Sequence, residues 1–298
     1  MIEPRHRDDP PAGPVSSSDD GANGVTARVA SAVVLALVAL AVAYVGGAVF
    51  LALCAVAAGG ILGEWVWLVR RRADARILTP GLLALAAAAA FIGLGRLDAA
   101  AAAIAVGAMA ACLITAARPL APLPPGGALW AGGGVIYAGA ALFGPAVLRR
   151  DPTEGFIGLL FLFATVWMTD IFAFACGRAV GGPLLWPRIS PRKTWAGAIG
   201  GVLGGVAAGV AVAYASGIGR LGIVGVMALL LSLLAQAGDL FESAVKRRFG
   251  AKDASRLIPG HGGLMDRLDG FLVAAAAALI IGVVRQGTAT PARGLLLW

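Results

Sequence analysis

Apolar segments of about twenty residues recur along almost the whole chain, and shorter polar segments separate them. An α-helix rises about 1.5 Å per residue, so each segment is long enough to cross the hydrocarbon core of a bilayer. The apolar region 28–69 is too long for one crossing, and the pair Gly46-Gly47 offers a hinge between two helices. The pattern predicts nine transmembrane helices, two within 28–69 and others at roughly 79–95, 99–117, 128–148, 156–177, 196–216, 219–237 and 267–284.

The polar segments divide the chain into three regions. Residues 1–27 are rich in Pro, Gly, Ser and Asp and hold few large apolar side chains, which predicts a disordered polar tail. No small-residue cleavage site stands out there, so a cleaved signal peptide is not expected. Residues 28–150 carry the N-terminal transmembrane helices, and residues 151–298 form a C-terminal transmembrane region. The expected fold class is all-α, in a polytopic integral membrane protein.

Composition supports this class. Hydrophobic residues make up 59% of the 298 positions and charged residues only 13%, against about 25% charged in soluble domains. A very hydrophobic soluble bundle is the alternative. The net charge of +8 indicates loops that face anionic headgroups and phosphates, and no nucleic-acid partner is expected. Cys54, Cys112 and Cys176 lie in apolar segments without metal-like spacing, so we interpret them as small buried residues.

The distribution of Lys and Arg between loops predicts the orientation. With nine helices and the N-terminus inside, the inside loops receive 70–76, Arg118, 178–193 and 246–267, and the outside receives Arg96, Arg149, Arg150, Arg220 and the tail arginines. Because positive loops stay in the cytoplasm, we expect a multi-pass protein of the plasma (inner) membrane. Its polar active site would face the cytoplasm.

The densest charge lies between Asp239 and Asp269, where five acidic and six basic residues gather. An amphipathic surface helix with salt bridges would explain such a run. Two features favour a functional site instead. Ionisable groups at the edge of a bilayer core are unfavourable and usually functional, and the glycines of "PGHGG" at 259–263 let backbone N–H groups approach a phosphate closely.

This charged segment resembles a known family. Its pattern is similar to the signature of the phosphatidate cytidylyltransferases (CDP-diacylglycerol synthases), as are parts of 165–178, "WPRISPRKTWAG" at 186–197 and 236–243. The family commonly has Lys where this chain has Arg192, and Glu where it has Ala196. The resemblance covers roughly 165–272. The signature residues are Ser243-x-Val245-Lys246-Arg247, Lys252-Asp253 and Pro259-x-His261-Gly262-Gly263-x-x-Asp266-Arg267-x-Asp269.

The resemblance implies a reaction in which CTP and phosphatidate give CDP-diacylglycerol and pyrophosphate, with Mg²⁺ as cofactor. Region 151–298 would be catalytic, with its signature at 243–269. The lipid phosphate is itself the nucleophile, so the reaction needs charge neutralisation and in-line positioning and no general base. Expected partners are CTP, phosphatidate and membrane lipids. The sequence leaves the oligomeric state open, a homodimer included.

The implied site residues fall into three groups. Catalytic candidates are Asp239, Lys246, Asp266 and Arg267. The carboxylates of Asp239, Asp266 and Asp269 are candidates for Mg²⁺, which typically takes one or two carboxylates plus substrate phosphates. Candidates for substrate binding are Ser190, Arg192, Lys193, Thr194, Arg247, Lys252, Arg256, His261, Gly262 and Gly263. Because one triphosphate must touch both groups of bases, segments 178–194 and 239–269 are expected to meet.

Alternatives stay open at this point. Each of three residues has a second interpretation. His261 either binds a phosphate or only shapes its loop, and Arg247 either binds substrate or faces the lipid headgroups. Asp170 is either a ligand or the partner of Arg178 in an ion pair. A secondary transporter is a second class of function, but the first half lacks the interrupted segment that an inverted repeat would show. A non-catalytic lipid-binding protein and a cytidylyltransferase for another lipid phosphate are further alternatives.

Overall fold

The structure is a computed structural model, and it describes residues 20–117, 126–251, 255 and 263–298, with side chains from residue 33 onward. The chain divides into two compact units, Met1–Ala39 and Leu40–Trp298. The first unit contains the start of the first helix. The second unit holds the other elements and every predicted site residue that is described.

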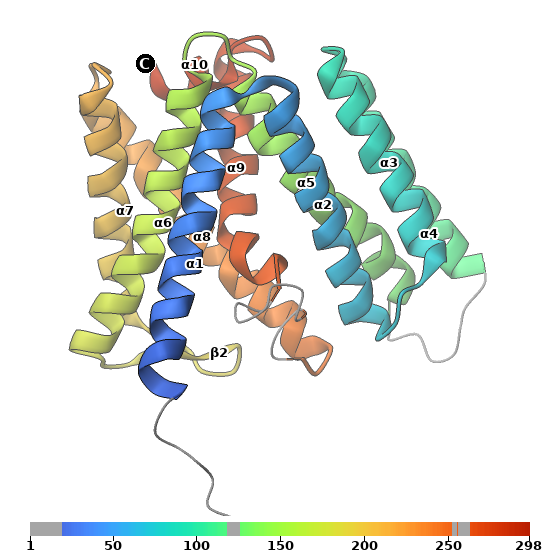
Figure 1. Cartoon of the computed structure of the whole chain (residues 1–298), viewed down its shortest axis with the longest axis horizontal. Coiled ribbons are helices and arrows are strands. Elements are labelled where there is room, and N and C mark those ends of the chain that lie inside the picture. The colour runs from blue at the N-terminus through green and yellow to red at the C-terminus, as the bar shows by residue number, and fades with distance from the viewer. Residues whose placement is uncertain (1–19, 118–125, 252–254, 256–262) are drawn as a thin grey trace, which may run out of the picture. The chain divides into compact units, whose positions relative to one another are not determined.

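Ten helices and two short strands follow one another in the described chain (Figure 1). They are α1 (Asp20–Val45), α2 (Gly47–Arg70), α3 (Ala75–Gly93), α4 (Leu97–Ala117), α5 (Gly127–Arg149), α6 (Gly155–Val180), β1 (Leu184–Trp186), β2 (Ser190–Thr194), α7 (Trp195–Ala215), α8 (Leu221–Arg248), α9 (Met265–Gln286) and α10 (Pro291–Leu296).

Eight of these helices, α2 to α9, are long and apolar enough to cross a membrane. They confirm eight of the nine predicted spans and the all-α polytopic class.

The first predicted span coincides with α1, whose apolar described part, Val33–Val45, is shorter than a span. α1 begins at Asp20, inside the segment expected to be a disordered tail. An acidic residue at a helix start is favoured by the helix dipole, which polar composition alone does not reveal.

The predicted hinge between the first two helices is confirmed. Gly46 and Gly47 have positive φ angles of 68° and 56°, a conformation that glycine adopts without the steric penalty of a side chain. Arg149, at the end of α5, donates from Nε to the carbonyl oxygen of Ala43 at 2.6 Å and from Nη2 to that of Tyr44 at 2.9 Å. The last carbonyls of α1 are thereby satisfied at the break.

The segment 178–194, expected to be a loop, contains a small antiparallel sheet. Strands β1 and β2 pair with Leu184 opposite Thr194 and Trp186 opposite Ser190. This hairpin is the one departure from the all-α expectation in the described chain. Its strands are too short to give a clear alternating pattern in the sequence. The hairpin leaves β2 in contact with α7 and α8.

Helices α6 and α7 lie side by side over much of their length (Figure 1). A Cβ atom added at Gly201 would lie 2.8 Å from the carbonyl oxygen of Thr169, and one at Gly197 would lie 2.7 Å from that of Ala173. Only glycine permits this approach, as in other membrane helix pairs built on small residues. The interpretation of the paired glycines of α7 as close helix packing is confirmed.

Helix α8 continues beyond its predicted end near residue 237 to Arg248. Its last turns carry charged side chains that pair with residues of β2 and α9. The end of α8, the start of α9 and the β1–β2 hairpin lie at the same end of the helices of the second unit (Figure 1). This end holds the candidate site.

Candidate active site

Charged side chains from four elements line one cavity of about 750 Å³, here called the charged cavity. The segments 178–194 and 239–269 both contribute to it, which confirms that they meet, while their place on the cytoplasmic side stays a prediction. The charged lining residues are Asp170 and Arg178 of α6, Arg192 and Lys193 of β2, Asp239 and Lys246 of α8, and Asp266, Arg267 and Asp269 of α9.

The first link across the charged cavity joins the hairpin to α8. The ammonium group of Lys193 forms an ion pair with Asp239 Oδ2, and the two side chains are 28% and 34% exposed. The neighbouring Thr194 also lines the cavity, and its hydroxyl accepts a hydrogen bond from the backbone N–H of Gly197 at 3.1 Å. Thr194 therefore caps the N-terminus of α7 and fixes the exit of β2 beside Lys193.

The second link joins α8 to α9 through Lys246. Its ammonium nitrogen lies 2.5 Å from Glu242 Oε2 and 2.7 Å from Asp266 Oδ1. The other oxygen of Asp266 accepts from the backbone N–H of Gly263 at 3.0 Å. The Lys246 and Asp266 side chains are each only 14% exposed, so these charges are poorly screened by water. One lysine thus holds two acidic groups from separate helices.

Glu242 was not among the predicted site residues. Its side chain is 1% exposed and lies one turn before Lys246. The signal was present in the sequence, because Asp239, Glu242 and Lys246 follow the three- and four-residue spacing of one helix face. The partner on α9 was not visible in that spacing.

Most of the predicted residues gather at the charged cavity. Asp269 lies one turn after Asp266, and its Oδ1 accepts from the backbone N–H of Gly270 at 2.7 Å. Gly263 does not line the cavity but donates to Asp266. The predicted site residues that line it are Ser190, Arg192, Lys193, Thr194, Asp239, Lys246, Asp266, Arg267 and Asp269.

Arg247 lies outside the charged cavity. This exposed side chain donates from Nε to the carbonyl oxygen of Ile189 at 3.4 Å and from Nη1 to that of Ala251 at 3.5 Å. It therefore braces the turn of the hairpin against α8, and its assignment to substrate binding stays a prediction. Four further candidates, Lys252, Arg256, His261 and Gly262, lie outside the described residues.

Asp170 lines the charged cavity from α6. Asp170 and Arg178 are both described, and no ion pair joins them within 4 Å. The alternative that Asp170 serves only to neutralise Arg178 is not supported. Its position instead adds a carboxylate from α6 to the lining of the cavity.

The donor set fits a magnesium ion that is completed by substrate. No group of three acidic, His or Cys side chains in the described part of the chain could hold a metal ion by itself. Mg²⁺ commonly takes one or two carboxylates and fills its octahedron with water and phosphate oxygens. Asp239, Asp266 and Asp269 are the candidate carboxylates in the lining of the cavity.

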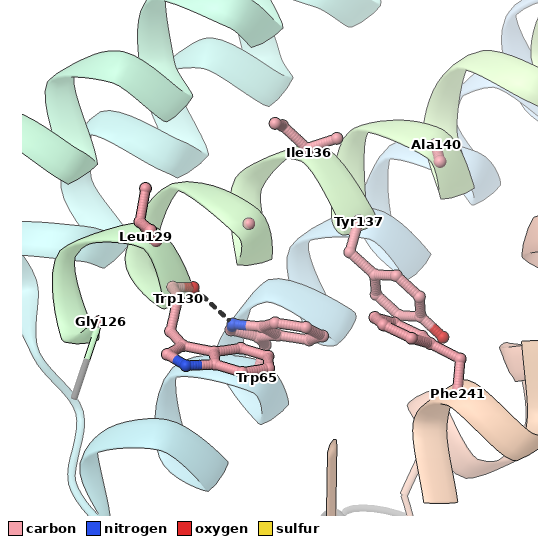
Figure 2. A pocket seen from close by; sticks show the side chains of 9 residues that line it. Trp65, Gly126, Leu129, Trp130, Ile136, Tyr137, Ala140 and Phe241 are labelled. Atoms are coloured by element: carbon pink, nitrogen blue, oxygen red, sulfur yellow. Dashed lines mark hydrogen bonds between the residues drawn. The ribbon is translucent and has the colours of Figure 1, made fainter. Parts of the chain in front are cut away.

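A second cavity of about 610 Å³ is lined by apolar and aromatic residues of α2, α5 and α8 and is called the apolar cavity (Figure 2). Trp65 Nε1 donates to the carbonyl oxygen of Trp130 at 2.8 Å. The Tyr137 ring lies between those of Trp65 and Phe241, with centroid distances of 5.2 Å and 6.0 Å. Phe241 lies between Asp239 and Glu242 in sequence, so α8 contributes to both cavities.

Comparison with known proteins decides the family. The model of the Cytidylyltransferase family matches residues 26–284. The chain belongs to the cytidylyltransferase family. A phosphatidate cytidylyltransferase of Brucella abortus biovar 1 (strain 9-941) is 40% identical over 267 residues, which cover 86% of this chain and 93% of that protein. A phosphatidate cytidylyltransferase of Staphylococcus aureus (strain COL) is 43% identical over 121 residues, or 40% of this chain and 46% of that protein.

Membership in the cytidylyltransferase family confirms the resemblance drawn from 165–272 and identifies the chain as a nucleotidyltransferase. It also extends the resemblance, because the match includes the N-terminal helices, which were similar to the family only as apolar spans. Ala196, where the chain departs from the family's pattern, is not among the residues that line the charged cavity.

Proposed function

We propose that the chain is a phosphatidate cytidylyltransferase that forms CDP-diacylglycerol and pyrophosphate from CTP and phosphatidate. The observation that carries the proposal is the charged cavity, whose lining combines bases of α6, β2, α8 and α9 with carboxylates of α6, α8 and α9. The printed names of the relatives, phosphatidate cytidylyltransferases of several bacteria, support the choice of substrate.

The reaction that suits this cavity needs no protein nucleophile. A phosphate oxygen of phosphatidate attacks the α-phosphorus of CTP. The bond from that phosphorus to the oxygen that bridges the α- and β-phosphates then breaks, and pyrophosphate leaves. Arg192, Lys193 and Arg267 would neutralise phosphate charge and align the two substrates, which is where most of the rate enhancement in phosphoryl transfer originates.

Asp239 and Asp266 are the proposed Mg²⁺ ligands, with Asp269 as a further donor. When bound, the ion supplies positive charge that offsets the charge of the triphosphate. Before substrate arrives, Lys193 pairs with Asp239, and Lys246 pairs with Asp266. These pairs hold the carboxylates in place and limit their mutual repulsion.

The apolar cavity suits an acyl chain of the lipid substrate. Its lining combines aliphatic, aromatic and glycine residues. It includes Gly126, Leu129 and Trp130 at the N-terminal end of α5 and Phe241 in the C-terminal part of α8. An amphiphile at this end of the helices would have its phosphate near the charged cavity and a chain among the aromatic rings.

The activity is tested by measuring pyrophosphate released by the purified protein in lipid micelles. We expect release only when CTP and phosphatidate are both present. Release with another lipid phosphate and not with phosphatidate would replace the proposed substrate. No release with any lipid phosphate would contradict cytidylyl transfer and favour a binding or transport protein.

We further propose that the charged cavity faces the cytoplasm, in the plasma membrane. The Lys and Arg bias of the loops supports this orientation. A cysteine introduced at Arg188, between β1 and β2, in a chain whose native cysteines are replaced, should react with an impermeant maleimide in inside-out vesicles. Reaction in intact spheroplasts instead would reverse the orientation.

A further inference from the structure

Glu64 is a buried carboxylate within α2, far from the charged signature in sequence. Its side chain is 4% exposed, and the adjacent Trp65 and Val66 are also buried. Among the described residues, no Lys or Arg lies within ion-pair distance of it. A carboxylate in a membrane helix is unfavourable unless hydrogen bonds compensate for its lost hydration. Its position therefore requires an explanation from its contacts.

The contacts of Glu64 lie on both sides of the signature residues 256–262. Oε1 accepts from Ser255 Oγ at 2.6 Å and from the backbone N–H of Leu264 at 2.8 Å. Oε2 accepts from the backbone N–H of Met265 at 2.6 Å. All three bonds join α2 to the segment that enters α9.

These bonds replace an ordinary helix cap. The first N–H groups of a helix have no partner within the helix and are usually satisfied by a local side chain. Leu264, at the N-cap position of α9, provides no such bond. A carboxylate also carries the charge that the N-terminal end of the helix dipole favours. Glu64 thus caps α9 from another membrane helix.

The capped turn carries the candidate chemistry. The consecutive N–H groups of Gly263, Leu264 and Met265 donate to two carboxylates, the first to Asp266 and the other two to Glu64. Asp266 and Arg267 follow directly and line the charged cavity, whereas Glu64 does not line it. A shift in this turn would move both cavity residues together.

We propose that Glu64 is a positioning residue of the active site, which fixes the first turn of α9 and so holds Asp266 and Arg267 in the charged cavity. The inference rests on the proposed function of that cavity. Glu64 touches no substrate. It acts through the backbone of Leu264 and Met265.

The test compares Glu64→Gln with Glu154→Gln. Glutamine keeps the size of the side chain but replaces one acceptor oxygen by a donor, so at least one of the three bonds must be lost. Glu154, at the N-cap position of α6, makes no side-chain bond to its helix, so it is a chemically matched control. We expect Glu64→Gln to lower kcat at least tenfold with KM for CTP changed less than about threefold, and Glu154→Gln to stay near wild type.

Hydrogen exchange gives a readout that does not depend on turnover. In Glu64→Gln, amides of a peptide covering 263–268 should exchange faster, while those of the middle of α5 should not change. If Glu64→Gln fails to fold, Ser255→Ala takes its place in the test. This variant removes one donor and leaves the two backbone bonds, and it should lower kcat by about threefold.

Three outcomes would overturn the inference. These are a normal kcat in Glu64→Gln, an equal loss in Glu154→Gln, and unchanged exchange of 263–268. A wild-type protein that releases no pyrophosphate would instead contradict the proposed function. The exchange comparison would then still decide whether Glu64 holds the start of α9.

Discussion

At the scale of single residues, the candidate site consists of paired opposite charges. Lys193 pairs with Asp239, and Lys246 pairs with both Glu242 and Asp266. The pairs Lys193–Asp239 and Lys246–Asp266 join separate elements, whereas Lys246–Glu242 lies within α8, and each side chain is held before any ligand binds. The remaining bases of the cavity, Arg192 and Arg267 among them, extend the positive surface.

Asp266→Asn and Asp239→Asn should each lower turnover by about a hundredfold or more. Removal of one preorganised polar group from an active site typically lowers kcat by about that factor. An amide oxygen is a weaker ligand for Mg²⁺ than a carboxylate and neutralises no lysine. Pyrophosphate release at saturating Mg²⁺ measures the effect. Asp98→Asn, at an exposed aspartate in the first turn of α4, is the control. Near-normal turnover by either cavity variant would remove that residue from the metal site.

Two basic residues at the same end of the molecule should differ in effect. Lys193 lines the charged cavity, whereas Arg248 does not line it and lies over the ring of Trp130 at 5.7 Å. Loss of a charge that contacts phosphate removes roughly 1.5–3 kcal/mol, and loss of a surface charge near headgroups removes about 1 kcal/mol.

We therefore expect Lys193→Ala to lower kcat/KM for CTP at least tenfold and Arg248→Ala to stay within about threefold. Both are assayed in the same anionic micelles with CTP varied. Equal losses would mean that the bases act as a general positive surface. The same contrast is predicted for Lys252→Ala, although Lys252 lies outside the described residues.

At the scale of elements, the sequence predicted what local patterns encode. Helices α2 to α9 were predicted because each has an apolar run of membrane-spanning length. The β1–β2 hairpin was missed, because strands this short show no clear alternation. Glu64 was missed for a different reason. A lone Glu in an apolar helix has no visible partner until folding brings it to the start of α9.

The α6–α7 contact is an element-scale feature that should tolerate little change. A methyl group at Gly201 would meet the backbone oxygen of Thr169, which cannot move without moving α6. Gly201→Ala should therefore destabilise the protein by about 1–3 kcal/mol, the usual effect of overpacking. Thermal unfolding in detergent measures it. At Gly222 of α8 a Cβ would meet no atom within 4 Å, so Gly222→Ala should unfold near the wild-type temperature. A matching loss at Gly222 would show that the helix contact is not the cause.

At the scale of the whole molecule, residues 40–298 form one compact unit with two cavities of opposite character. Helix α8 lines both, with Asp239 and Lys246 at the charged cavity and Phe241 at the apolar cavity. Such an arrangement matches the two ends of a lipid phosphate, whose headgroup needs bases and whose chains need apolar surface. If an acyl chain occupies the apolar cavity, filling that cavity should change which lipids are used and leave the chemistry intact.

Gly133→Leu is the variant that separates these effects. Gly133 lines the apolar cavity, and a Cβ added there would lie 3.9 Å from the Trp65 ring, at ordinary contact distance. We expect kcat/KM for long-chain phosphatidate to fall at least fivefold relative to short-chain phosphatidate. The reason is that about two or more buried methylene groups, near 0.8 kcal/mol each, lose their contacts.

Two controls accompany this variant. Gly222→Leu, at a position that lines neither cavity, should leave the ratio of the two kcat/KM values unchanged. Asp266→Asn should lower both rates equally, since it acts on the phosphate chemistry. A Gly133→Leu protein with the wild-type ratio would mean that the acyl chains of the substrate lie elsewhere.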